Sequence, residues 1–274
     1  MQLEPIADGV YLWEGAGNGP GDTNMGAVVD PDGITVIDTG MVPSQWRPFA
    51  EAIRNLELPV RRIVLTSADI WHVGGTRAFP NAGVYATKIV SDLLDQPLAI
   101  AAYCAFMPEH AGEFAELAES GTRSVTHLID APAVLTERIE VIPAPGHSSG
   151  DCVVLIPDTD VCFAGSLLTV GTRPLCFAGN PSEWVETLSA IREFATRFVP
   201  GRGPLGTRAD VDALRAYLTA CIGANGDLNA LIGGPWETWT HARFDAVNIE
   251  CAQLRQNGTD GLPPTMLRWI TPPS

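Results

Sequence analysis

Groups that can transfer protons lie close together in the stretch VLTSADIWHVGG, residues 64–75. An apolar run is followed there by Ser67, Asp69 and His72. Imidazole exchanges protons near neutral pH, and a neighbouring carboxylate can fix which ring nitrogen carries the proton. A second histidine, His147, follows a Pro-Gly pair in PAPGHSSGD. The two histidines predict acid–base chemistry, provided that the fold brings them together.

The composition favours an acidic globular protein. The 274 residues are 46% hydrophobic, with 32 acidic and 17 basic side chains and a formal net charge of −15. Such a chain is long enough for one large α/β domain, and its charge argues against nucleic acid or an anionic membrane as partner. No signal-peptide pattern or apolar run of about 18 residues is present, so we expect a cytoplasmic protein.

The six cysteines do not predict a metal or disulfide framework. None of them forms a C-x-x-C pair, and several stand in apolar runs such as DVCFAG. Free cysteine in such a context behaves as a small buried hydrophobe.

Two β-rich halves, each followed by helices, make up the chain. In the first half, strands are predicted over 9–15, 60–67 and 83–87 and a hairpin over 25–40, with helices over 44–58 and 88–120. The second helical stretch is interrupted at Pro97 and Pro108.

The second half repeats the alternation. Strands are predicted over 137–146, 152–158, 161–167 and 197–203, and helices over 182–196, with Ser182 as N-cap, and over 208–223. This order favours two sheets packed face to face and covered by helices on both outer sides.

In the order of its segments, the chain resembles the metallo-β-lactamase superfamily of hydrolases from about residue 9 to 218. The landmarks are VIDTG (36–40), LTSADIWHVGG (65–75), FPNAGVYAT (79–87), PAPGHSSGDCVVLIPD (143–158), VCFAGSLL (161–168) and VPGRGPLGTRADV (199–211). The resemblance implies a single α/β domain over residues 1–274, an αββα four-layer sandwich of two mixed β-sheets flanked by helices. It also implies a helical insertion over about 88–120 that covers the substrate. We expect residues from about 220 to 274 to form a C-terminal helical extension.

The resemblance also implies a set of metal-binding positions, most of which are altered in this sequence. Active members of the family place two zinc ions on histidines and aspartates. His72 and His147 are retained at two of these positions. Five other positions have changed to Ser67, Asp69, Trp71, Ser166 and Arg202. Serine hydroxyls are poor zinc ligands and a guanidinium repels a cation, so we expect no dizinc centre, no metal and no other cofactor.

The remaining residues favour a metal-independent enzyme that acts on a small organic substrate. We expect His147, His72 and Asp69 to be catalytic and Ser67, Trp71, Ser166 and Arg202 to bind substrate, with Arg202 holding an anionic group and Trp71 stacking on a ring. The reaction is expected to be a cyclisation, an elimination, a rearrangement or the cleavage of an ester or thioester. The resemblance to cyclase-like and thioesterase-like members favours specialised metabolism.

Three other interpretations stay open. One is a non-catalytic protein that binds a small molecule in the pocket at the altered metal-binding positions. Another is a mononuclear metallohydrolase that uses Asp69, His72 and His147. The third is a serine hydrolase with Ser67 or Ser166 as nucleophile. The C-terminal extension is expected to cap the pocket or to form a homodimer face.

Overall fold

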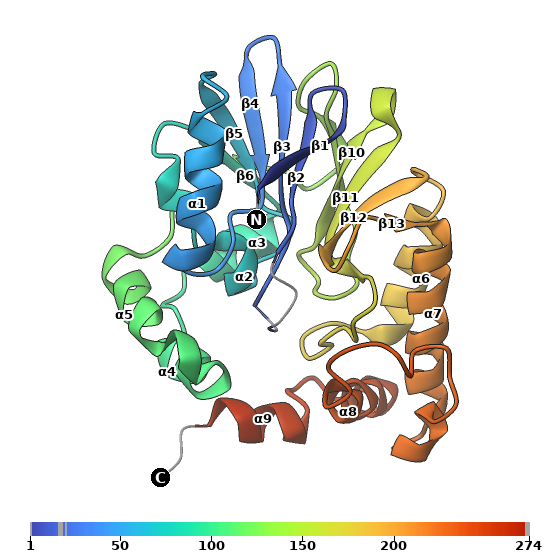
Figure 1. Cartoon of the computed structure of the whole chain (residues 1–274). Helices are drawn as coiled ribbons and strands as arrows, with labels where there is room; N and C mark the ends of the chain where they lie inside the picture. Colours follow the sequence, from blue (N-terminus) through green and yellow to red (C-terminus); the bar gives the residue numbers. More distant parts are fainter. Residues whose placement is uncertain (1, 16–18, 20, 272–274) are drawn as a thin grey trace.

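The computed structural model describes residues 2–15, 19 and 21–271, and its first sheet has seven strands in sequence order (Figure 1). The strands up to β4 pair antiparallel, and those from β4 onward pair parallel. Their bounds are β1 Leu3–Ala7, β2 Val10–Trp13, β3 Met25–Asp30, β4 Gly33–Ile37, β5 Val60–Val64, β6 Gly83–Ala86 and β7 His127–Leu128. All five residues of β4 are buried, as expected for an apolar run in the middle of a covered sheet.

The second sheet has six strands in the order β13-β12-β11-β10-β9-β8. The β11–β12 pair is parallel and the others are antiparallel, so this sheet is also mixed. The bounds are β8 Ala133–Val134, β9 Glu140–Pro143, β10 Cys152–Ile156, β11 Val161–Thr169, β12 Arg197–Arg202 and β13 Gly206–Thr207.

Three hydrophobic clusters hold four layers together. One includes Phe49 and Ile53 of α1 (Pro43–Arg54) and lies under the first sheet's outer face. A second joins the two sheets and includes Val28 and Phe163. The third packs α6 (Pro181–Ile191) and α7 (Arg208–Gly223) on the second sheet. This arrangement confirms the predicted αββα sandwich of two mixed sheets.

The helix starts follow capping chemistry. Thr207 and Asp210 form a capping box at the start of α7. For α6 the prediction of Ser182 as N-cap is wrong, because Asn180 accepts the hydrogen bond from the Ser182 backbone N–H and Pro181 occupies the first helical position. Short helical turns also occur as η1 (Thr76–Ala78) and η3 (Pro157–Thr159).

Helices lie below the open edge of the sandwich in Figure 1. The segment 88–120 contains α3 Lys88–Leu94, α4 Ile100–Phe106, η2 Pro108–His110 and α5 Ala111–Ser120, with the breaks at the two prolines. The C-terminal part contains η4 Leu228–Leu231, α8 Phe244–Gln256 and α9 Pro264–Ile270. Within the described part of the chain, no helix has the length and apolar character needed to cross a bilayer.

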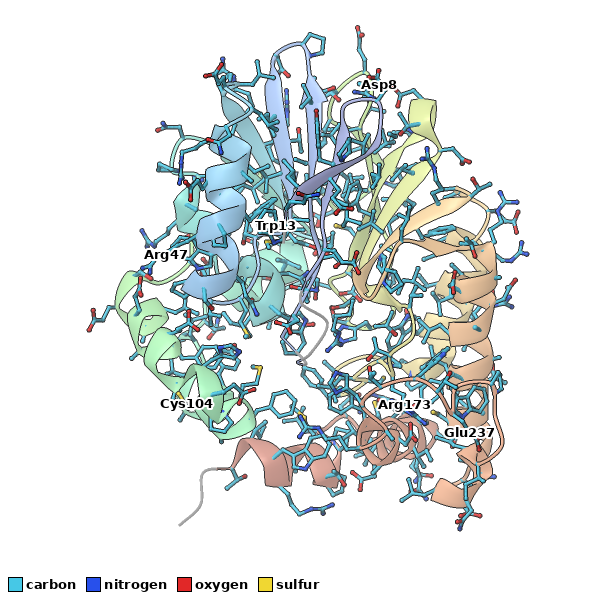
Figure 2. The ribbon with its side chains drawn as sticks, viewed as in Figure 1. Asp8, Trp13, Arg47, Cys104, Arg173 and Glu237 are labelled. Atoms are coloured by element: carbon cyan, nitrogen blue, oxygen red, sulfur yellow. The ribbon has the colours of Figure 1, made fainter. Side chains whose placement is uncertain are left out.

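Arg173 ties the C-terminal part to the second sheet. It is almost fully buried and forms an ion pair with Asp245 of α8 at 2.7 Å. In Figure 2 Arg173 is labelled among the C-terminal segments. Helix α8 is thereby held beneath the edge of the sandwich where α9 meets α4.

Candidate functional site

The side chains predicted to do chemistry come from the ends of strands in both sheets. Asp38 follows β4, and the loop after β5 carries Ser67 and Asp69 before α2 (Ile70–Val73). In the second sheet His147 follows β9, Ser166 lies within β11, and Arg202 is the last residue of β12. Because β4 is parallel to β5 and β11 is parallel to β12, these ends converge on one edge of the sandwich.

A buried chain of hydrogen bonds joins Asp38, His72 and Ser166. His72 Nδ1 lies 2.8 Å from Asp38 Oδ2, and His72 Nε2 lies 2.7 Å from Ser166 Oγ. A carboxylate only accepts, so Nδ1 carries the proton, and in the neutral ring Nε2 accepts from the serine hydroxyl. Burial alone would lower the pKa of His72, but the adjacent Asp38 raises it above its usual value.

The backbone around this chain has little freedom. Asp38 has φ of 56° and accepts two more hydrogen bonds, from the Thr66 backbone N–H at 2.8 Å and the Thr66 hydroxyl at 2.6 Å. Ser166 follows Gly165, which has φ of +50° and packs so closely that a β-carbon there would lie 2.1 Å from Thr66 Oγ1. Glycine is therefore required at 165 to place Ser166 beside His72.

His147 is part of a separate pair. Its Nε2 lies 3.1 Å from the carbonyl oxygen of Leu175, and its Nδ1 lies 3.4 Å from Asp69 Oδ2. The ring is almost fully buried and packs edge-on against Trp184 and Phe177. The contact with Asp69 does not meet hydrogen-bond geometry, which leaves Nδ1 without a hydrogen bond among the described residues.

Asp151 fixes the loop that carries His147. It accepts hydrogen bonds from the Ser148 backbone N–H and the Ser148 hydroxyl, both at 2.6 Å. Burial raises the pKa of Asp151 to about 6, while the neighbouring His147 acts in the opposite direction. Asp151 thereby fixes the position of Ser148, which borders the main pocket.

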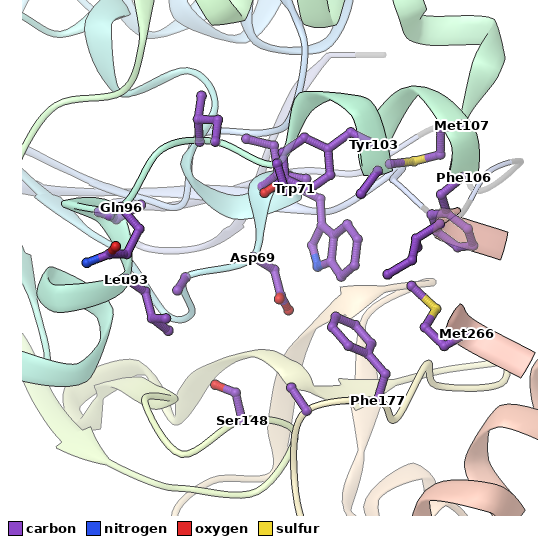
Figure 3. Close-up of a pocket in the computed structure, with 18 of the residues that line it drawn as sticks. Asp69, Trp71, Leu93, Gln96, Tyr103, Phe106, Met107, Ser148, Phe177 and Met266 are labelled. Atoms are coloured by element: carbon purple, nitrogen blue, oxygen red, sulfur yellow. The ribbon is translucent and has the colours of Figure 1, made fainter. Parts of the chain in front are cut away.

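A pocket of about 400 Å³ opens between this edge and the surrounding helices (Figure 3). Its wall comes from α3, α4, α9 and the loop after β11, and its floor contains Asp69, Trp71 and Ser148. In Figure 3 the Asp69 side chain lies beside Trp71 and points toward the side of the pocket where Ser148 and Phe177 are labelled. Burial, with a smaller effect of Asp69, raises the pKa of Tyr103 in the wall to about 12, so its phenol stays neutral.

Arg202 lies beyond Trp71, outside this pocket. Its guanidinium carbon is 5.8 Å from the centre of the indole ring, and the side chain is 4% exposed. Burial lowers the pKa of Arg202 to about 10, while Asp69 and Asp22 act to raise it. Arg202 borders a second cavity of about 240 Å³ together with Asp22 and His241. The anionic group that Arg202 is predicted to hold would therefore lie in that second cavity and not in the main pocket.

Of the seven predicted site residues, Asp69 and Trp71 border the main pocket. The others are buried and do not border it: Ser67, His72, His147, Ser166 and Arg202. The fold gives the two imidazoles separate partners and does not bring them together in one cavity. His72 is engaged at both nitrogens by Asp38 and Ser166, and His147 turns to Leu175 and Asp69.

The other three histidines lie away from the floor of the pocket. His110 pairs with Glu113 at 3.1 Å, His127 stacks on Tyr85, and His241 stacks on Phe244. Sequence reasoning missed Asp38 and Asp151. The signal for Asp38 was a carboxylate directly after the apolar run of VIDTG, since a charged group at a strand end is placed for a partner.

The sequence of residues 18–201, more than half of the chain, matches the profile of the metallo-β-lactamase superfamily. The chain belongs to this superfamily. A search of curated proteins finds no match.

Solved structures of metallo-β-lactamases share the fold at low sequence identity. The enzyme FIM-1 from Pseudomonas aeruginosa, in its mono-zinc form, is 20% identical with a TM-score of 0.61, over 79% of this chain and 93% of that one. The metallo-β-lactamase from Hirschia baltica is 18% identical with a TM-score of 0.61, over 80% and 97% of the two chains. VMB-1 is 18% identical with a TM-score of 0.63, over 80% and 96%.

The residues at the superfamily's metal positions do not fit a pair of zinc ions. Trp71 supplies an indole and Arg202 a buried cation, where metal ligands would stand. His72 Nε2 is occupied by Ser166, and Asp69, His72 and His147 do not converge on one point. In the part of the chain that the structure describes, no three His, Cys, Asp or Glu side chains gather as metal ligands.

Proposed function

We propose that this member of the metallo-β-lactamase superfamily is a metal-independent enzyme that transfers protons on a small, largely apolar organic substrate. One observation supports this most strongly: Asp69 borders the pocket with the buried Nδ1 of His147 3.4 Å behind it. In this pair Asp69 can contact the substrate, and its partner His147 is buried away from water.

The hydrogen bonding of His147 leaves its Nδ1 facing the Asp69 carboxylate. The carbonyl of Leu175 only accepts, so His147 Nε2 carries a proton and donates it. A bare lone pair on Nδ1 would then face a carboxylate oxygen inside the protein, which is repulsive and leaves a buried polar atom unsatisfied. We propose that Nδ1 carries a proton that faces Asp69, which removes both penalties. When the 3.4 Å separation closes to hydrogen-bond distance, this proton can pass to Asp69 and be exchanged with a substrate.

The pocket offers a matched hydrogen-bond donor. The neutral phenol of Tyr103 can donate to a substrate carbonyl oxygen while Asp69 accepts a proton from an adjacent carbon or hydroxyl. Return of that proton to another substrate atom completes an isomerisation, a cyclisation or an elimination. For an ester or thioester, the same carboxylate would remove a proton from water while the water oxygen attacks the acyl carbon. The C–O or C–S bond then breaks, and the proton passes to the leaving alcohol or thiol.

The test of metal independence is elemental analysis combined with chelation. Trp71 and Arg202 remove two ligand positions, and Ser166 occupies His72, so purified protein should contain well under one equivalent of zinc, iron or manganese. Treatment with EDTA should leave the melting temperature and turnover of apolar esters, thioesters or enolisable ketones unchanged. Stoichiometric metal that is lost in both Asp69→Asn and His147→Ala would overturn the proposal.

A second candidate is a serine hydrolase, favoured by the Ser166–His72–Asp38 chain at 2.7 and 2.8 Å. In this reaction Ser166 Oγ attacks an acyl carbonyl, His72 accepts the hydroxyl proton and later protonates the leaving group, and water releases the acyl enzyme. The Trp71 indole lies between Ser166 and the pocket, with its N–H 3.4 Å from Ser166 Oγ. Substrate would reach Ser166 only if this side chain moved.

A fluorophosphonate probe separates the two candidates. Under the proton-transfer proposal, intact-mass spectrometry should show no labelling of the wild type, and the Trp71→Ala variant should remain unlabelled or react slowly at Ser166. Rapid labelling of the wild type that is lost in Ser166→Ala would favour the serine hydrolase.

A further inference from the structure

We propose that the ligand of the main pocket carries a protonated amine on a planar, apolar skeleton. This inference rests on the proposed function, because it concerns the same pocket and the same carboxylate. The amine is placed at Asp69 and the skeleton against the aromatic side chains of the wall.

The charge of the pocket favours a cation. Asp69 is the one charged side chain among the described residues that border it. Arg202, on the far side of the Trp71 indole, and His147, behind Asp69, offset part of this charge, but neither side chain borders the pocket. Two further carboxylates, Asp38 and Asp151, act on the same group of side chains. In a pocket with few polar groups, this arrangement attracts a cation and repels a carboxylate.

The wall supplies ring faces for the same ligand. Trp71, Tyr103, Phe106 and Phe177 all border the pocket, and the Trp71 and Phe177 rings meet edge to face with centres 6.4 Å apart. Arg202 lies over the Trp71 ring and Arg243 over the Phe106 ring, so among the described residues Tyr103 and Phe177 are the rings of this wall without an arginine over them. Aromatic faces attract cations, and they also stack on flat apolar skeletons. The remaining wall is mostly aliphatic, from the leucines of α3 and the side chains of α9. An apolar ligand therefore loses little by leaving water.

The geometry of Asp69 leaves one oxygen for the ligand. Its interactions with Ser67 and His147, both at 3.4 Å, use Oδ2. Among the described residues no hydrogen bond reaches Oδ1, and the carboxylate points into the pocket in Figure 3. An ammonium group can donate to Oδ1 while its skeleton lies against the Trp71 and Phe177 side chains that border the pocket. The Asp69–His147 pair keeps its own contact in this arrangement.

The experiment uses three probes with one skeleton: 2-naphthylmethylamine, 2-naphthylmethanol and 2-naphthoic acid. Titration calorimetry with the full chain at pH 7 should show the amine binding at least about tenfold tighter than the alcohol, because a charge-assisted hydrogen bond and ring contacts add to the same apolar contact. The acid should bind weakest. In Asp69→Asn the amine and the alcohol should bind about equally.

The controls keep charge and folding separate. Asp92→Asn removes an equivalent charge from the exposed side of α3 and should leave the preference for the amine intact. Phe177→Leu should weaken the amine more than the alcohol, which tests the ring contact even if Asp69→Asn is poorly folded. Binding of the acid as tightly as the amine, or an unchanged amine preference in folded Asp69→Asn, would overturn the inference.

The failure of this inference and that of the proposed function are distinguishable. If the amine binds as expected but metal-stripped protein turns nothing over, the ligand class stands and the enzyme proposal fails. If metal-independent turnover is found only with acidic substrates, the enzyme proposal stands and the ligand class is wrong.

Discussion

Asp69→Asn should lower kcat by at least about a hundredfold, because a positioned general base typically contributes about 10²–10⁴ in rate. The amide fills the same space at the pocket floor but accepts no proton. His147→Ala should lower kcat to a similar extent, because Asp69 then has no partner with which to share the proton. Steady-state kinetics on variants with an unchanged melting temperature measures both effects.

Variants of the second buried chain are the matched controls for this prediction. His72 is 0% exposed and Ser166 is hydrogen-bonded to it, so Ser166→Ala should change kcat by less than about tenfold if neither group meets the substrate. Near-normal turnover in folded Asp69→Asn and His147→Ala, combined with inactive Ser166→Ala, would contradict the proton-transfer mechanism and favour the serine hydrolase.

Asp38→Ala should have the largest effect on stability, with a loss of about 3–5 kcal/mol in the free energy of unfolding, the range for breaking a buried charged pair. The carboxylate accepts from Thr66 N, Thr66 Oγ1 and His72 Nδ1, and all three donors would be left buried. Alanine also tolerates the left-handed backbone at φ 56° poorly. Urea unfolding with an unchanged slope measures the loss.

Asp38→Asn is the matched variant, and pH separates charge from shape. Asparagine tolerates the left-handed backbone and keeps an acceptor for Thr66, so its cost should be smaller, about 1.5–3 kcal/mol. Asp38 raises the pKa of His72 in the folded protein, so the pair contributes to the free energy of unfolding. This contribution is fully present below the pKa of His72 in the unfolded chain, about 6.5, and is lost as pH rises through the pKa of His72 in the folded protein. As pH rises through this range, the free energy of unfolding should fall less in Asp38→Asn than in the wild type. A loss of less than about 1 kcal/mol in the free energy of unfolding for Asp38→Ala would contradict this role of the Asp38 hydrogen bonds.

The fold could be predicted from the sequence wherever a local pattern was strong. The 208–223 helix has its capping box and apolar spacing within one segment, and the helical stretch from 88 breaks at the predicted prolines. Strands β7 and β8 have two residues each, which is too short for a periodicity to mark them. Strand β7 pairs with β6, 42 positions earlier, whereas β8 pairs with the nearby β9. The cap of α6 was misplaced because Asn180 and Ser182 are both good caps.

The candidate site was predictable in its members but not in its contacts. Asp69 and Trp71 are two positions apart in the sequence, and both border one pocket. The partner of His72, by contrast, is 34 positions earlier in the chain, and its other contact is 94 positions later. The side of Trp71 on which Arg202 lies depends on how β12 meets α2, and the sequence pattern carries no information about that packing.

The protonation of His147 Nδ1 tests the central claim most directly, and it requires no substrate. In ¹⁵N-histidine-labelled protein at pH 7, with His147→Ala used for assignment, the proposal predicts that both ring nitrogens of His147 carry or share a proton. The Nδ1 chemical shift should then move in Asp69→Asn, because that proton has lost its carboxylate. A shift typical of a bare imidazole nitrogen, unchanged in Asp69→Asn, would contradict the account.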